Sequence, residues 1–236
     1  MRCGVSKHRQ ASYDKKLSMR TLTTVLICFG ALLVPASAQK REGPPTTPGK
    51  FDYYLLSLSW SPQYCSEMGD DPSDPQCAAG RHFGFVVHGL WPENQNGVNP
   101  RTCKPAQQLD AQAEKSVLDL MPSHQLISHE WGAHGTCSGL APAEFLKLTR
   151  VAAQKVKIPA KYQGPKTALV VPVKEFRQSL LDANPGLKSE NIALYCDDRF
   201  LREVRVCMDK SLNFRACGER VHDACGLAKM VLKSVK

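Results

Sequence analysis

Ten cysteines occur in this chain of 236 residues, and eight of them lie after residue 64. An even number of cysteines in an exported chain is typical of a disulfide framework, which limits the chain to folds that bring these positions together in pairs. Zinc is the alternative interpretation, but no C-x2-C pair, a common spacing in structural zinc sites, occurs after residue 38. The spacing alone does not choose among the many possible pairings. The eight residues are Cys65, Cys77, Cys103, Cys137, Cys196, Cys207, Cys217 and Cys225.

The first 38 residues have the pattern of a secretory signal. The apolar run Leu22–Val34 follows Met19 and a basic residue, and it precedes the A-x-A-type cleavage site in Pro35–Ala38. A transmembrane helix needs about 20 apolar residues, so we expect no membrane anchor. We therefore expect export to a periplasm or to the extracellular space, with translation starting either at the first residue or at Met19.

The remainder of the chain is long enough for one domain with a sizeable core. We expect residues 39–50, which are polar and rich in Pro and Gly, to form a mobile leader, and residues 51–236 to form the domain. Removing residues 1–38, which hold six basic residues and one acidic residue, lowers the formal net charge from +9 to +4. This mild positive charge favours a protein that meets polyanions without the dense basic stripe of a dedicated duplex binder. We expect a monomer.

Helical and strand patterns mix along the chain without a regular alternation, which indicates an α+β fold. We expect a single domain with an antiparallel sheet core, helices packed against it and disulfides that stabilise it. The predicted strands are residues 51–60, 83–87, 192–195 and 200–208, the second of which ends at His88. The predicted helices are residues 109–121, 129–134, 142–156 and 174–182.

Two short segments carry most of the reactive side chains of this sequence. FGFVVHGLWPEN at residues 83–94 and SHEWGAHGTC at residues 128–137 hold three of the seven histidines and two of the three tryptophans. Histidine takes and gives a proton near neutral pH, and titratable groups gather at functional sites. Each segment therefore indicates part of an active site rather than a lone core histidine. The candidate residues are His88, His129, Glu130 and His134.

The string HEWGAH also resembles the helix of a zinc protease. That site needs two histidines four residues apart, on one face of a helix. His129 and His134 are five residues apart, so at about 100° per residue their imidazoles diverge by about 140°. The spacing therefore argues against a zinc-protease site; separately, we expect no metal site and no cofactor.

The first segment resembles the first active-site segment of the T2 family of ribonucleases, a hydrophobic strand that runs into HGLWP. The second segment resembles that family's HEWxKHGTC. The two segments occur in the family's order, about 40 residues apart, and a looser similarity extends from Phe51 to Cys225. One position departs from the pattern, because Ala133 stands where the family usually has lysine. The resemblance implies a secreted, disulfide-bonded endoribonuclease of single-domain α+β fold.

RNA carries its own nucleophile, the 2′-OH, so its cleavage needs a base, an acid and groups that stabilise the phosphoryl charge. The resemblance implies His134 as the base and His88 as the acid, although these two roles are exchangeable. It also implies that His129 binds the phosphate, that Glu130 orients the histidines, and that no metal is required. The expected substrate is single-stranded RNA, and the expected products are 2′,3′-cyclic phosphate and then 3′-phosphate ends. The absence of lysine at Ala133 is expected to cost on the order of 10²-fold in rate unless another cation replaces it.

Two further residues of the first segment are candidates for contact with a base. Trp91 either stacks on a base or packs in the core, and its place in the family's base-binding segment favours the base. Glu93 stands where a family carboxylate reads the edge of a base, which makes it a weaker candidate for specificity. We expect Trp131, in the second segment, to pack in the core.

The resemblance also implies how the cysteines pair. One disulfide would tether the end of the segment that holds His134, and each disulfide is expected to contribute about 2–4 kcal/mol to stability. The implied pairs are Cys65–Cys77, Cys103–Cys137, Cys196–Cys225 and, enclosed by the third, Cys207–Cys217.

Two non-enzymatic interpretations compete with the ribonuclease. A secreted module that binds RNA or a protein without turnover is favoured by Ala133, but His88, Glu130 and His134 are all present. A disulfide-rich inhibitor or toxin explains only the cysteines. The sequence therefore favours an enzyme.

Overall fold

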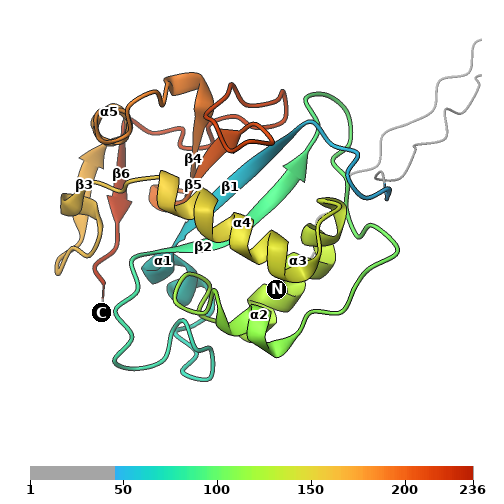
Figure 1. Cartoon of the computed structure of the whole chain (residues 1–236). Helices are drawn as coiled ribbons and strands as arrows, with labels where there is room; N and C mark the ends of the chain where they lie inside the picture. The colour runs from blue at the N-terminus through green and yellow to red at the C-terminus, as the bar shows by residue number, and fades with distance from the viewer. Residues whose placement is uncertain (1–45, 236) are drawn as a thin grey trace, which may run out of the picture. The chain divides into compact units, whose positions relative to one another are not determined.

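The computed structural model, which describes residues 46–235, contains a six-stranded sheet at its centre (Figure 1). The strand order is β2-β1-β5-β6-β3, and β4 also pairs with β5. Every pairing is antiparallel except the short contact between β5 and β6. The strands are β1 (Tyr53–Trp60), β2 (Phe85–Glu93), β3 (Leu169–Pro172), β4 (Ile192–Asp197), β5 (Phe200–Met208) and β6 (Lys229–Leu232).

Within residues 46–235, five α-helices accompany the sheet, and α4 lies across β1 and β2 on the same side as α2 and α3 (Figure 1). The predicted α+β fold with an antiparallel sheet core and packed helices is confirmed. The expected signal region lies outside the described residues, as does most of the expected leader, so both stay predictions. The helices are α1 (Ser61–Glu67), α2 (Ala111–Lys115), α3 (His124–Ala133), α4 (Pro142–Lys155) and α5 (Val173–Ala183).

Three details of the predicted elements are wrong. The helix expected over residues 109–121 is reduced to α2, because the chain turns from Ser116 onward, although Val117 and Met121 still pack in the core. The strand expected to end at His88 continues to Glu93. Strands β3 and β6 were not predicted, since four residues are too few to establish an alternating pattern.

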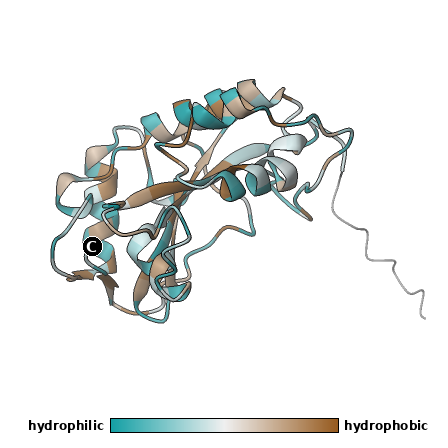
Figure 2. Ribbon diagram, turned by 90° about the horizontal axis from the view of Figure 1, so that it is seen from below, coloured by the Kyte–Doolittle hydropathy of each residue, from teal (hydrophilic) through white to brown (hydrophobic). Residues whose placement is uncertain are grey.

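The core lies between the sheet and the helices, and the helix ribbons alternate between apolar and polar residues along their length (Figure 2). Residues of β1 are buried on both faces, with only Ser59 partly exposed. Helix α4 buries Phe145, Leu146 and Ala152 on one side and carries charged residues on the other, the amphipathic pattern of a helix that covers a sheet. No helix among residues 46–235 is long and apolar enough to cross a bilayer.

Four disulfides join the described cysteines in the pairs that the family resemblance implies. Cys103–Cys137 connects the loop before α2 to the short 3₁₀ helix that follows α3, so it ties two segments 34 residues apart. The other three pairs are Cys65–Cys77, Cys196–Cys225 and Cys207–Cys217.

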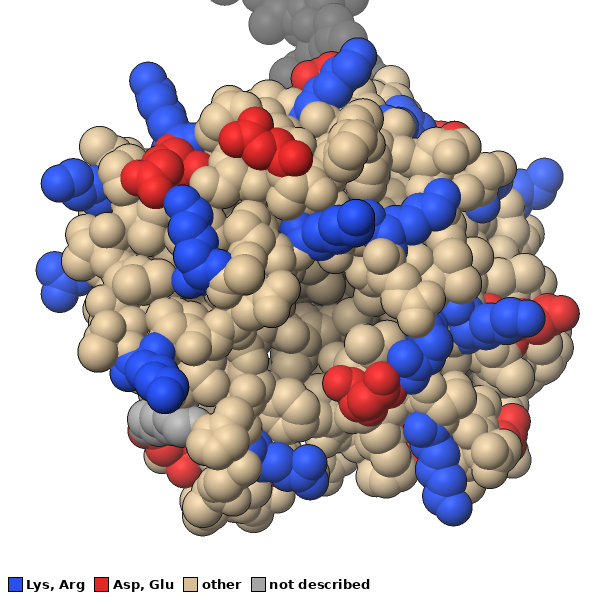
Figure 3. Space-filling model, turned by 60° about the vertical axis from the view of Figure 1, so that its left-hand side comes forward, with Lys and Arg blue, Asp and Glu red and all other residues tan. Residues whose placement is uncertain are grey.

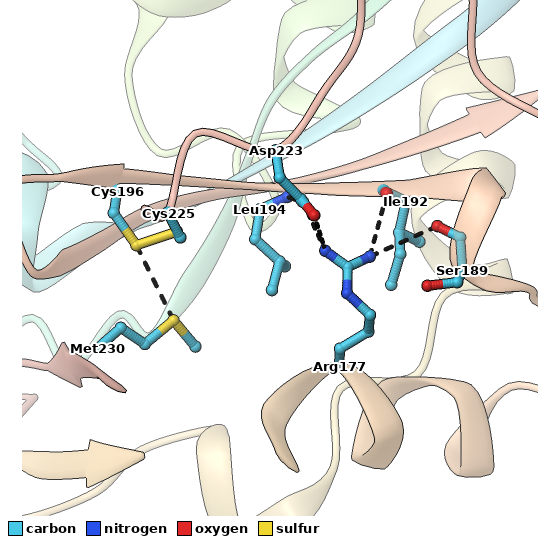
Figure 4. A network of polar contacts seen from close by, with 8 residues as sticks. All are labelled: Arg177, Ser189, Ile192, Leu194, Cys196, Asp223, Cys225 and Met230. Atoms are coloured by element: carbon cyan, nitrogen blue, oxygen red, sulfur yellow. Dashed lines mark hydrogen bonds and ion pairs between the residues drawn. A yellow bond between two sulfur atoms is a disulfide. The ribbon is translucent and has the colours of Figure 1, made fainter. Parts of the chain in front are cut away.

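A polar network holds α5 and the C-terminal segment against β4 (Figure 4). The guanidinium of Arg177 donates to the carboxylate of Asp223 and to the backbone oxygen of Ile192. Asp223 in turn accepts the backbone N–H of Leu194 at 2.9 Å. Because the Cys196–Cys225 disulfide lies beside this network, the C-terminal end of the domain is fastened by both covalent and polar contacts.

Candidate active site

His88 is displaced from the regular register of its strand. On β1, Ser57 pairs with Gly89 and Leu58 pairs with Val87, so His88 is an extra residue on β2 with no partner on β1. This is a β-bulge, which bends a strand and redirects a side chain. Without it, residues 88 and 91 would point to opposite faces of the sheet, because alternate residues of a strand do so. The bulge brings the imidazole of His88 to 5.2 Å from the ring of Trp91, measured between centroids.

The imidazole of His88 is hydrogen-bonded to a carboxylate on β5, a strand that is not adjacent to β2 in the sheet. Nδ1 of His88 lies 2.8 Å from Oε1 of Glu203 on β5. Strand β1 separates β2 from β5, which places them about 10 Å apart at about 4.8 Å per strand spacing. Ser59 of β1 pairs with Glu203 and lines the same cavity as both residues. Its small side chain leaves room for the histidine and the glutamate to meet above it.

Glu130 is buried between the two segments that the sequence singled out. Helix α3 supplies this side chain, which is 3 % exposed. Its Oε2 accepts the indole N–H of Trp91 at 2.6 Å, and its Oε1 lies 3.5 Å from Nε2 of His88. A Cβ at Gly89 would collide with Oε2 of Glu130 and with Nε1 of Trp91. Glycine is therefore required at this position, because only the bare backbone lets the glutamate approach the strand.

His134 sits directly beyond the C-terminal end of α3. Its backbone N–H donates to the carbonyl of Glu130, and its ring stacks on Trp91 with centroids 5.2 Å apart. The residue is only 8 % exposed, and Nδ1 is buried without a hydrogen-bond partner in the described part of the chain. The indole of Trp91 thus lies against both imidazoles, in a T-shaped arrangement with His88 and a stacked one with His134.

The two imidazoles have opposite electrostatic surroundings. Burial and the positive charges of Arg101, His88 and His129 lower the pKa of His134 to about 3. Burial also disfavours the charged form of His88, but the hydrogen bond and negative charge of Glu203, together with Glu130, raise its pKa above 6.5. Over the interval between these two pKa values, His134 is neutral while His88 carries a proton.

The carboxylates of the site differ in the same way. Burial raises the pKa of Glu130, and the nearby His88 and the indole N–H of Trp91 only partly offset this effect. Burial also opposes ionisation of Glu203, yet its contacts with His88 and Arg205 outweigh burial and lower its pKa to about 2. Glu203 is therefore the ionised partner that keeps His88 protonated.

A cavity of about 420 Å³ opens beside His88. His129, on the exposed side of α3, lies on its wall together with Ser59, Gln125 and Arg202. The structure thus places His129 at an accessible edge of the site, whereas His88, Glu130 and His134 form its interior. No three His, Cys, Asp or Glu side chains of residues 46–235 are grouped as a set of metal ligands.

The two candidate base contacts are buried. Trp91 is 9 % exposed and Glu93 is 6 % exposed. The carboxylate of Glu93 accepts a hydrogen bond from Asn99, and burial raises the pKa of Glu93 to about 7. In this structure Trp91 supports the two imidazoles, so contact of either residue with a base stays a prediction. Trp131 packs against Phe145 in the core, as expected.

Three charged residues of the site were not found by the sequence analysis. Glu203 and Arg205 lie two residues apart on β5, where they alternate with apolar residues, and such a charged pair on one face was a usable signal. Their side chains are paired, since Nε of Arg205 donates to Oε2 of Glu203 at 2.8 Å. Arg101 lies in an irregular segment with no distinguishing pattern. Together with the histidines, these residues form a site in which one group can accept a proton as a base and another can donate a proton as an acid.

The similarity to known proteins extends beyond the two histidine-bearing segments to most of the chain. The model of the ribonuclease T2 family matches residues 51–217. A ribonuclease of Aeromonas hydrophila is 34 % identical over 228 residues, which cover 90 % of this chain and 99 % of that protein.

Among solved structures, trichomaglin, described as an S-like ribonuclease, superposes with a TM-score of 0.65 at 20 % identity, covering 79 % of this chain and 100 % of that one. An RNase-related protein from Calystegia sepium gives 0.64 at 19 % identity, with 79 % and 98 % coverage. At these identities the two structures support the fold.

Proposed function

The chain belongs to the ribonuclease T2 family, and from that premise we propose that it is an exported endoribonuclease that cleaves single-stranded RNA by transesterification. The observation that carries the proposal is the pair His88 and His134, placed against one indole with their pKa values displaced in opposite directions. The reaction needs a base that takes a proton from the nucleophile and an acid that gives a proton to the leaving group. A neutral and a protonated imidazole held side by side meet both needs.

In the proposed reaction, neutral His134 takes the proton of the 2′-OH, whose oxygen attacks the adjacent phosphorus. Protonated His88 gives its proton to the departing 5′-oxygen, and a 2′,3′-cyclic phosphate remains. Water then opens the cyclic phosphate to a 3′-phosphate with the two roles reversed. The reaction needs no metal ion, because the substrate brings its own nucleophile and the two imidazoles perform both proton transfers.

The neighbouring residues have positioning and binding roles in this proposal. Glu203 holds His88 through Nδ1 and so directs the opposite nitrogen, Nε2, toward the site. Glu130 fixes Trp91 and hence the spacing of the two imidazoles. His129 binds a phosphoryl oxygen at the accessible wall of the cavity beside His88, and this cavity takes a nucleotide next to the scissile bond.

The surface charge supports RNA as the substrate, and the disulfides support export as the destination. On the face shown in Figure 3, Lys and Arg side chains clearly outnumber Asp and Glu around a hollow in the surface, which favours approach of a polyanion. Four disulfides are compatible with an oxidising environment outside the cytosol. We propose a monomer in the periplasm or the extracellular space.

Cleavage of a short single-stranded RNA by residues 39–236 in excess EDTA tests the proposed function. We expect fragments that carry 2′,3′-cyclic phosphate ends first and 3′-phosphate ends later, identified by mass spectrometry. An RNA that lacks the 2′-OH at one position should resist cleavage there. A folded protein that binds RNA but releases no such ends would instead establish the non-catalytic module that Ala133 favours.

The rate should follow a bell-shaped pH profile with its maximum on the acid side of neutrality. As pH rises through about 3, His134 loses its proton and becomes a base, so kcat/KM increases. As pH rises further, above the ordinary histidine value of 6.5, His88 loses the proton it must donate, so kcat/KM decreases. Initial rates on a dinucleotide between about pH 2 and pH 9 check this shape, because that range extends beyond both limbs.

Replacing Glu203 by glutamine should move the alkaline limb of this profile to lower pH. The amide keeps a hydrogen-bonding group of the same size but removes the negative charge that raises the pKa of His88, while burial continues to lower it. The acid limb, which His134 sets, should stay in place. Asp119→Asn, which neutralises an exposed carboxylate paired with Arg150, serves as the control. An unchanged alkaline limb in Glu203→Gln would contradict the role of Glu203.

A further inference from the structure

The site lacks the lysine that the family pattern places just before the second catalytic histidine. Ala133 occupies that position at the last residue of α3, where it is buried. Cleavage of a phosphodiester builds negative charge on the phosphoryl oxygens, so loss of a preorganised cation is costly. A cation supplied by another residue near Ala133 would restore this stabilisation of the transition state.

The segment around Arg101 is fastened to Ala133 and its neighbours. The N–H of Thr102 donates to the carbonyl of Ala133 at 2.9 Å. The N–H of Cys103 donates to Oγ1 of Thr136 at 3.2 Å, and the Cys103–Cys137 disulfide closes the same contact covalently. The backbone that carries Arg101 is therefore held directly against the histidine-bearing segment, one residue from the position where the lysine is missing.

The guanidinium of Arg101 is exposed and uncommitted. It forms no hydrogen bond or ion pair with another residue of the described chain, 46–235. Its positive charge nevertheless acts on both sides of the reaction centre, because it helps to lower the pKa values of Glu130 and His134. A cation whose charge acts on both groups, carried by backbone fastened beside Ala133, is near enough to interact with the negative charge of a reacting phosphate.

Two other arginines near the site already have charged partners. Arg205 donates to Glu203 and lies over the ring of Tyr195 at 3.7 Å, so its charge is compensated and its position is fixed. Arg202, on the wall of the cavity, pairs with Glu67 at 3.2 Å. Arg101 is the arginine of these three that is free to meet a substrate.

We propose that Arg101 is a catalytic residue that donates to the phosphoryl oxygens of the transition state and so replaces the lysine absent at Ala133. The inference rests on the proposed ribonuclease function. Arg101 forms and breaks no covalent bond in this role. The proton of the 2′-OH still goes to His134, and the 5′-oxygen still receives its proton from His88.

Three variants test the proposal on a dinucleotide substrate. Arg101→Ala is expected to lower kcat by about 10²-fold with a small effect on KM, the size of loss known for removal of one preorganised donor. Arg101→Ala combined with Ala133→Lys is expected to regain most of that loss, because the lysine restores a cation from the adjacent segment. Lys147→Ala, which removes one exposed positive charge on α4, controls for the general attraction between protein and RNA.

Binding measurements separate stabilisation of the transition state from attraction to the ground state. A complex of uridine with vanadate mimics the five-coordinate phosphorus, whereas 3′-UMP carries an ordinary phosphate. Arg101→Ala should weaken the first by about the same factor as kcat, and the second much less. Equal losses for the two ligands would overturn the proposal, because they would make Arg101 a ground-state binding residue.

The kinetic outcomes also distinguish this inference from the function on which it rests. A wild-type chain that leaves RNA intact overturns both. An active wild type, with Arg101→Ala as fast as Lys147→Ala, overturns the role of Arg101 alone. Because Arg101 is exposed and unpaired in the described chain, its substitution is expected to leave the thermal unfolding midpoint unchanged, which is measured on the same samples.

Discussion

Replacement of either His88 or His134 by alanine is expected to lower kcat for RNA cleavage by about 10²–10⁴-fold, the usual contribution of a positioned acid or base. The two losses have different physical origins. His134→Ala removes the group that activates the 2′-OH, whereas His88→Ala removes the proton that the 5′-oxygen needs in order to leave. A substrate that requires no proton on its leaving group therefore separates them.

Uridine 3′-(4-nitrophenyl phosphate) is such a substrate, because nitrophenolate departs without protonation. On this compound His88→Ala should recover most of the wild-type rate, while His134→Ala should remain slow. The reverse pattern would exchange the acid and the base. His222→Ala, at an exposed histidine, is the matched control and should match wild type on both substrates. Full activity of either active-site variant on RNA would contradict the two-histidine mechanism.

Removal of the Cys103–Cys137 disulfide is expected to lower the free energy of unfolding by about 3–4 kcal/mol. It is also expected to lower kcat for RNA cleavage. The free energy follows from loop entropy, since this bond closes a separation of 34 residues. The activity is lost because the same bond holds the Arg101 segment against the segment of His134. The double variant Cys103→Ala/Cys137→Ala, studied by urea unfolding and by kcat at a temperature where it remains folded, measures both effects.

The Cys196–Cys225 disulfide provides a matched control. It closes a separation of 29 residues, so its removal should cost a similar free energy, also about 3–4 kcal/mol. It fastens the C-terminal segment to β4 instead of holding the histidines, and kcat of its folded double-alanine variant should be retained. Equal losses of kcat in the two variants would mean that the Cys103–Cys137 bond stabilises the fold without ordering the site.

Much of the fold could be predicted from the periodicity of apolar residues and from the prolines and glycines that begin or end helices and strands. The tyrosine- and leucine-rich stretch at residues 51–60 contains β1, and the apolar spacing after Pro142 forms α4, because burial of a continuous apolar surface dictates both. The prediction failed where an element is too short to show a period, as in β3 and β6. It also failed where a helical pattern was cut by turns after Lys115.

The candidate site was only partly predictable for a different reason. Its histidines and Glu130 lie in two compact segments, so local sequence was enough to identify them as a group. Glu203 is 115 residues from His88. Arg101 carries no local pattern at all, and it is placed by a backbone hydrogen bond and a disulfide. Contacts of this kind depend on which strands become neighbours, and no local pattern records that.

The sequence by itself determined the type of fold, the number of cysteines available for disulfides, and the presence of two histidine-bearing segments, because these follow from composition and from short-range periodicity. Only the tertiary structure decided how His88 meets its partners. The bulge on β2 turns its imidazole toward Trp91, and the small Ser59 on the intervening strand lets it reach Glu203. The pKa values of His88 and His134 diverge for the same reason: each depends on charges and burial that exist only after distant segments have packed together.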